Sequence, residues 1–129
     1  MDKLDRIFEM QEALNRDIVE KRKLHDIPDE KWIQMQTLAM MSEMAELIDE
    51  VNFKWWKNPK PVNSDNVKDE LVDILHFFVS MCLRAHMSPE ELFERYLAKN
   101  KENFDRQMGL SKKPGYDVKE LSVCDGGQQ

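Results

Sequence analysis

Two pairs of carboxylates, each pair three residues apart, have the residue types and spacing best suited to chemistry in this sequence. Glu43 and Glu46 form an E-x-x-E pair, and Glu70 and Asp73 form an E-x-x-D pair. At about 100° per residue on an α-helix, both pairs border an apolar stripe instead of lying on a fully solvated face. If the two stripes pack together, the carboxylates meet at the edge of a helix interface, where each resists ionisation unless a cation is near.

Oxygen ligands with no neighbouring cluster of His or Cys favour a hard divalent cation, Mg²⁺ or alternatively Mn²⁺. Because protein-bound Mg²⁺ usually shares its coordination shell with substrate phosphates, the pairs predict phosphate chemistry. The alternative is that these acids are ordinary surface charge, since 34% of all residues in the chain are charged.

Two further segments have two interpretations each. The aromatic and lysine side chains of Phe53–Asn58 either stack on a base and neutralise phosphates or anchor the core. Lys99, Asn103 and Arg106 share one helix face, which suits an anionic ligand or simply places cations at a helix C-terminus. We interpret the three histidines as structural or surface residues: His25, His76 and His86.

The elements that position these residues are predicted to be helices. With 129 residues, only 4 Gly and 5 Pro, the chain fits one compact all-α domain. Apolar periodicity and start signals predict helices over about 2–23, 28–52, 64–86 and 88 to 104 or 106. Ser64 or Asp65 is expected to cap the third helix, and Ser88 the fourth, with Pro89 at its first position. The expected domain is 1–110, followed by a tail over 111–129 that either folds over bound phosphates or stays mobile.

Charge and composition limit the kinds of partner and the location expected for this protein. The net charge of −6 gives no support for a nucleic-acid polymer or a membrane surface as partner. Without an apolar run of about 18 residues or a basic-then-apolar leader, a cytoplasmic location is expected. Cys82 and Cys124 are expected to be free thiols. Four short helices leave a thin core, so we expect a homodimer, with a dimer of dimers as the alternative.

Five segments together resemble the all-α, dimeric dUTP diphosphatases (dUTPases), within the MazG-like nucleoside triphosphate pyrophosphohydrolase group. The resemblance spans Leu4 to Tyr116 and implies a four-helix MazG-like bundle completed by oligomerisation. It also implies Mg²⁺-dependent hydrolysis of dUTP to dUMP and pyrophosphate, by attack of an activated water on the α-phosphate. The segments that carry it are Phe8–Gln11, Glu43–Glu50, Phe53–Asn58, Glu70–Phe77 and Lys99–Gln107.

The same resemblance assigns roles to single residues. It makes Glu46 and Glu43 the catalytic residues, with Glu46 orienting or deprotonating the attacking water. The Mg²⁺ ligands it implies are Glu43, Glu46, Glu70 and Asp73. The implied contacts to uracil and deoxyribose are Gln11, Phe53, Trp56 and Asn103, and those to the phosphates are Lys54, Lys57, Lys99, Arg106, Lys113 and Tyr116. The sequence departs from longer relatives in one respect, since only Met87–Pro89 joins its third and fourth helices.

Two alternative functions are consistent with the same residues. One is a dCTP-specific or broad-specificity pyrophosphohydrolase of the MazG-like type, which a panel of nucleotide substrates distinguishes from a dUTPase. The other is a non-enzymatic helical bundle in which the acids are surface charge or hold a structural cation. In that case changing Glu46 to Gln has no turnover to abolish.

Overall fold

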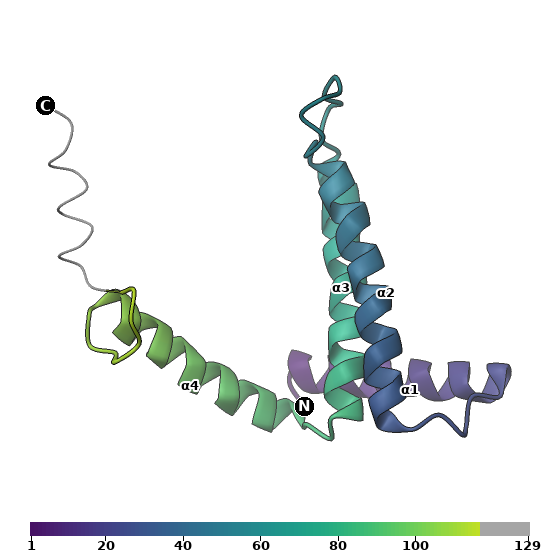
Figure 1. The fold of residues 1–129 in the computed structure, drawn as a ribbon. Helices are drawn as coiled ribbons and strands as arrows, with labels where there is room; N and C mark the ends of the chain where they lie inside the picture. Colours follow the sequence, from purple (N-terminus) through teal and green to yellow (C-terminus); the bar gives the residue numbers. More distant parts are fainter. Residues whose placement is uncertain (117–129) are drawn as a thin grey trace, which may run out of the picture. The chain divides into compact units, whose positions relative to one another are not determined.

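The computed structural model describes residues 1–116, which form four α-helices and no strand. Figure 1 shows their order along the chain: α1 (Lys3–Arg22), α2 (Asp29–Glu50), α3 (Ser64–Arg84) and α4 (Pro89–Gln107). The all-α prediction is confirmed, and the helices begin and end close to their predicted bounds. Most of the predicted tail, with Cys124, lies outside the described residues.

Local hydrogen bonds explain where two helices begin. Asp2 and Asp5 form a capping box at the start of α1, in which each side chain accepts from the other's backbone N–H, at 2.9 and 3.1 Å. The prediction that Ser64 or Asp65 caps α3 is wrong, because Asn63 does so. Its Oδ1 accepts from the backbone N–H of Asp65 at 3.0 Å while its own backbone stays extended, so Ser64 is already the first helical residue.

The described chain divides into two compact units, residues 1–89 and residues 90–116. In the first unit α2 and α3 form an antiparallel hairpin, and α1 crosses it at the end away from the connecting loop (Figure 1). The hydroxyl of Thr37 on α2 lies 3.3 Å from Sδ of Met81 on α3, so the two helices are in contact at this level.

The core of the first unit sits where its three helices meet. Phe8 from α1, Trp32 from α2, and Val79 and Cys82 from α3 are its buried apolar side chains. Cys82 is a free thiol, as predicted. A groove of about 480 Å³ remains between α1 and α3, and the apolar side chains that line it are Ile7, Met10, Leu14, Val72 and Leu75.

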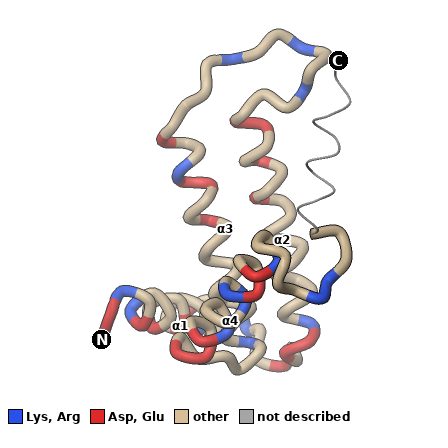
Figure 2. Tube along the Cα trace, turned by 90° about the vertical axis from the view of Figure 1, so that its left-hand side faces the viewer, with Lys and Arg blue, Asp and Glu red and all other residues tan. Residues whose placement is uncertain are grey.

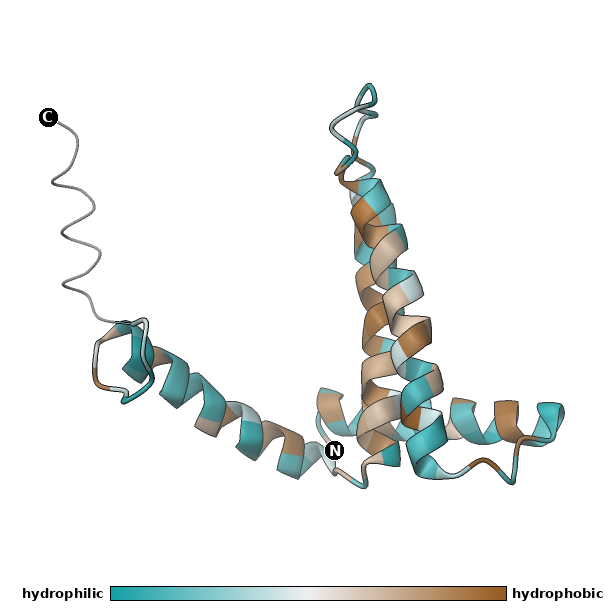
Figure 3. Cartoon of the chain, viewed as in Figure 1, coloured by the Kyte–Doolittle hydropathy of each residue, from teal (hydrophilic) through white to brown (hydrophobic). Residues whose placement is uncertain are grey.

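Hydropathy and charge are unevenly distributed over the surface. Apolar residues recur along α2 and α3 (Figure 3), and many large ones are exposed, among them Leu38 and Val72. The loop between α2 and α3 contains three lysines and no acid (Figure 2). Within residues 1–116 no single helix is long and apolar enough to cross a membrane; only α3 and α4 taken together reach the required length and composition.

Candidate metal centre and the cavity beside it

The packing of α2 against α3 brings three of the four predicted metal ligands together. Glu43 and Glu46 lie one turn apart on α2, and Glu70 faces them from α3. One carboxylate oxygen from each residue lies within 4.8 Å of the other two. Asp73, one turn after Glu70, lies outside this triad, but its charge still acts on Glu43.

The protein environment of these carboxylates disfavours their charge. Glu43 and Glu70 are half-buried while Glu46 is exposed. Desolvation, the hydrogen bond with Glu43 and the charge of Glu46 raise the pKa of Glu70 to about 7. The hydrogen bond with Glu70 favours the charged form of Glu43, but burial and the charges of Glu46 and Asp73 outweigh it and raise its pKa. The Glu43–Glu70 pair therefore shares a proton near neutral pH.

Two oxygens of this cluster are left without partners. The Oε2 atoms of Glu43 and Glu70 are buried and accept no hydrogen bond from the described residues. A buried acceptor without a donor is costly, and a cation held between the helices would satisfy both oxygens at once. The donor set is all carboxylate, which is the set that Mg²⁺ and Mn²⁺ prefer. The residues present therefore fit a hard divalent cation.

A cavity of about 550 Å³ opens beside the acids, between α1, α2 and α3. Glu43 and Asp73 line it, as do apolar side chains such as Met35 and Phe77. The buried polar residues of the described chain, Gln11, Gln36 and Ser80, line the same cavity. Because ligand sites typically combine apolar walls with a few convergent polar groups, this clustering indicates a site for a polar molecule.

Four of the polar side chains around the cavity are held by a chain of hydrogen bonds. Nδ1 of His76 lies 2.5 Å from Oε1 of Gln11. The amide nitrogen of Gln11 donates to Oδ1 of Asn15 at 2.9 Å, and the amide nitrogen of Asn15 donates to the Ser80 hydroxyl at 3.2 Å. The predicted substrate residue Gln11 thus lines the cavity, but neighbouring side chains already bond its amide.

The aromatic and lysine segment lies elsewhere in the first unit, in the loop that follows α2. Phe53, Lys54 and Lys57 line a second cavity of about 160 Å³. Trp56 packs edge-on against Trp55, with ring centroids 4.8 Å apart, and Trp55 is 85% exposed. The interpretation of these aromatic residues as core anchors is therefore wrong. They remain available to a ligand, but they do not line the cavity beside the acids.

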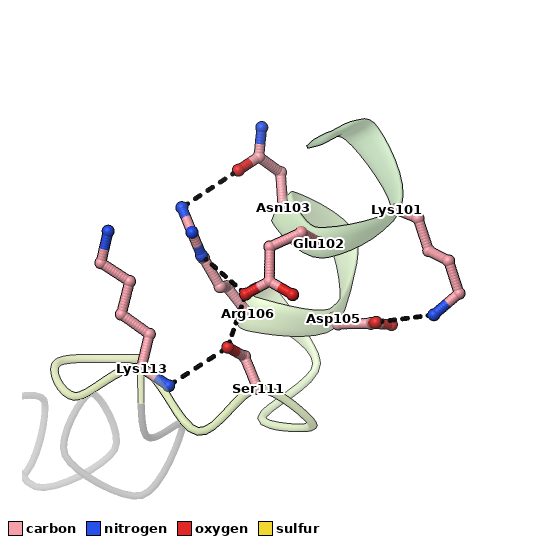
Figure 4. A network of polar contacts seen from close by, with 7 residues as sticks. All are labelled: Lys101, Glu102, Asn103, Asp105, Arg106, Ser111 and Lys113. Atoms are coloured by element: carbon pink, nitrogen blue, oxygen red, sulfur yellow. Dashed lines mark hydrogen bonds and ion pairs between the residues drawn. The ribbon is translucent and has the colours of Figure 1, made fainter. Parts of the chain in front are cut away.

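The remaining predicted substrate residues belong to the second unit. Arg106 donates to Glu102 through Nε at 3.1 Å and to Asn103 through a guanidinium nitrogen at 3.3 Å (Figure 4). Glu102 also accepts from the Ser111 hydroxyl at 2.8 Å, and these bonds lower its pKa. Arg106 lies 5.8 Å from the ring of Tyr116. Asn103 and Arg106 therefore form one polar group on α4, and Lys99 is exposed on the same helix.

Sequence reasoning missed several residues of the cavity. Asn15 lies four residues after Gln11, and His76 three after Asp73, so both share a helix face with a predicted site residue. That spacing was a usable signal. Gln36 and Ser80 lie seven residues from Glu43 and Asp73, but a polar residue within an apolar stripe does not reveal which cavity it faces, so neither was predicted.

The comparisons with known proteins identify the family of the chain. The family model of the dUTPases matches residues 3–91, which contain α1, α2, α3 and the acidic cluster. The chain belongs to the dUTPase family. Most of α4 lies beyond the matched residues.

Two curated relatives carry a related name. A dCTP pyrophosphatase of Enterobacteria phage T4 is 32% identical over 100 residues, covering 67% of this chain and 57% of the relative. A dCTP pyrophosphatase of Enterobacteria phage LZ5 is 40% identical over 74 residues, covering 57% of this chain and 43% of the relative. The chain spans about half the length of these relatives. No solved structure matches it significantly.

Proposed function

We propose that this chain is a pyrophosphohydrolase that converts a deoxypyrimidine nucleoside triphosphate to its monophosphate and pyrophosphate, with Mg²⁺ or Mn²⁺ at the acidic cluster. The substrate is dUTP, or alternatively dCTP. The dUTPase family model supports dUTP, and the curated relatives, named dCTP pyrophosphatases, support dCTP.

One observation carries this proposal: an acidic cluster with two unpartnered buried oxygens borders a cavity lined by buried neutral polar side chains. A nucleoside triphosphate has the matching parts, since its phosphates bind best through a divalent cation and its base is planar, apolar on its faces and polar at its edge. The cavity volume lies in the range of ordinary small-molecule sites.

The burial of each carboxylate suggests its role in binding the cation or in accepting a proton. Glu43 and Glu70, half-buried, together with Asp73 and Glu46 would hold the cation, which when bound supplies neutralisation of phosphate charge and acidification of a water. Glu46 is exposed, so its carboxylate is accessible to a water attacking the α-phosphorus and accepts the proton that this water loses. The apolar walls of the cavity are suited to pack against the faces of the base.

The lysines of the α2–α3 loop supply positive charge next to the acidic part of the hairpin. Lys54 lies 3.6 Å from Asp49 and 5.9 Å from the Phe53 ring. Because the loop carries no acid, it is suited to the pyrophosphate that leaves. On α4, Arg106 remains a candidate for phosphate contacts and Asn103 for contacts to uracil and deoxyribose, as the resemblance implies.

The experiment is release of pyrophosphate from dUTP, dCTP, dTTP, dATP, dGTP and UTP, each with Mg²⁺ and with EDTA. We expect turnover of dUTP, of dCTP or of both, abolished by EDTA. Comparable turnover of purine nucleotides would move the chain to the broad-specificity class. Folded protein that releases pyrophosphate from none of them would contradict the proposal and leave a non-enzymatic helical bundle.

A further inference from the structure

We propose that Gln36 is a specificity-determining residue: its amide oxygen accepts a hydrogen bond from the edge of the pyrimidine ring at N3 and C4. This inference rests on the proposed function. It adds a residue that neither the sequence pattern nor the resemblance assigns.

Gln36 has a buried acceptor with no donor. The residue is 8% exposed and lines the cavity, yet its Oε1 accepts no hydrogen bond from residues 1–116. The other buried polar residues of the cavity are satisfied, since Gln11 bonds Asn15 and His76, and Ser80 bonds Asn15. An unpaired buried amide costs stability, and such a cost is commonly tolerated where a ligand supplies the missing donor.

The position of Gln36 matches the geometry of a nucleotide. Gln36 lies seven residues before Glu43, which is about two helical turns or ~10 Å along α2 on the same face. Ser80 lies seven residues after Asp73, two turns along α3. The cavity therefore has an acidic end and a neutral polar end. Their separation is comparable to the span from the α-phosphorus of a nucleotide to the far edge of its pyrimidine.

The missing partner of Gln36 must be a donor, which limits the ligand chemically. With the phosphates at the acidic end, the ring edge opposite the sugar reaches Gln36. Uracil offers its N3–H there and cytosine offers its N4 amino group. A pyrimidine without a donor on that edge leaves the amide oxygen unpaired, and sites built to pair a polar group reject such analogues strongly.

The test compares Gln36→Met with Gln34→Met. Methionine has a similar length without the amide, and Gln34 is an exposed glutamine on the same helix, so it is the matched control. The substrates are dUTP, dCTP and the triphosphate of 2-pyrimidinone deoxyriboside, which has no donor at N3 or C4. We expect the wild-type chain to prefer its better natural substrate over this analogue by at least about tenfold in kcat/KM. Gln36→Met should remove that preference, and Gln34→Met should keep it.

Thermal unfolding separates this role from a structural one. If Gln36 serves the ligand, Gln36→Met removes an unpaired buried group and raises the melting temperature while it lowers kcat/KM for the natural substrate. Parallel loss of stability and activity, or an unchanged preference against the analogue, would overturn the inference while leaving the proposed function standing.

Failure of the proposed function has a separate signature. If the wild-type chain hydrolyses no triphosphate, calorimetric binding of dUMP and dCMP to the wild-type chain and to Gln36→Met still tests the residue. Binding that Gln36→Met weakens at least about tenfold supports the inference. Equal binding to both proteins, or none to either, overturns it.

Discussion

Replacing Glu70 with Gln should stabilise the metal-free chain at alkaline pH. Glu70 has a pKa of about 7 in the folded chain against an ordinary value of 4.5. Between these two values the folded state retains a proton that the unfolded state has lost. The stability contributed by this proton is fully present below pH 4.5 and is lost as pH rises through about 7. Glutamine imitates the protonated acid at every pH and donates to Glu43, so the variant avoids this loss.

The pKa sets the size of the effect at each pH. About nine in ten Glu70 side chains carry the proton at pH 6, half at pH 7 and one in ten at pH 8. The melting temperatures of the variant and the wild-type chain should therefore lie close together at pH 4, separate mainly between pH 4.5 and 7, and keep that separation at pH 8. Mg²⁺ should reverse the order at pH 8, because a ligand present at 100 times its Kd stabilises by about 2.7 kcal/mol.

The assay is thermal unfolding in EDTA across pH 4–8, repeated with Mg²⁺. Asp69→Asn is the matched control, because it removes one negative charge from the adjacent, exposed position outside the cluster. If Glu70→Gln melts at a lower temperature than the wild-type chain at pH 8 in EDTA, the carboxylates do not repel one another and the reasoning fails. A variant that gains as much from Mg²⁺ as the wild-type chain would remove Glu70 from the ligand set.

Three further predictions concern other parts of the molecule. Glu46→Gln should lower kcat by about 10²- to 10⁴-fold, as expected for loss of a general base. The melting temperature in EDTA should not fall, because the side chain is exposed and its charge repels Glu43 and Glu70. Steady-state kinetics and thermal unfolding beside Asp69→Asn check both expectations. Ser111→Ala should raise the pKa of Glu102 toward 4.5, because the Ser111 hydrogen bond is the largest cause of its lowered value. This hydrogen bond stabilises the fold above pH 4.5, and the effect is lost as pH falls. Carboxyl NMR titration measures the pKa, and an unchanged value would contradict the assignment. Leu75→Glu, in the apolar groove between α1 and α3, should raise the dissociation constant of the expected homodimer at least about tenfold, as measured by sedimentation equilibrium. Val62→Glu is the control, because Val62 is an exposed apolar residue in the loop. A monomeric wild-type chain would refute the prediction.

The helices could be predicted because their signals are local. Apolar residues recur at helical spacing, and prolines such as Pro59 and Pro61 interrupt the pattern, so each helix is visible in its own residues. The cap of α3 was placed one or two residues late because Asn63, Ser64 and Asp65 are all good caps. In the structure Asn63 is the N-cap, and N-cap propensity alone does not distinguish it from Ser64 or Asp65.

The candidate site could be predicted only in part. The E-x-x-E and E-x-x-D pairs predicted Glu43, Glu46 and Glu70 as metal ligands, and α2 and α3 bring these three residues together. The importance of Gln36 was invisible, because an amide that lacks a donor is defined by what surrounds it and not by its neighbours in sequence. The same holds for the apolar groove, because its lining residues on α1 lie more than fifty positions before those on α3.

The sequence by itself determined the helical content, the placement of two acidic pairs beside apolar stripes, and the family to which the chain belongs. These features depend on residues close together along the chain, or on segment patterns that can be recognised in the sequence alone. Only the tertiary structure decided which carboxylate oxygens converge, which of them are buried without a donor, and that a polar cavity opens beside them. The reason is physical, since burial and pKa depend on side chains brought together from distant segments, and packing sets those distances.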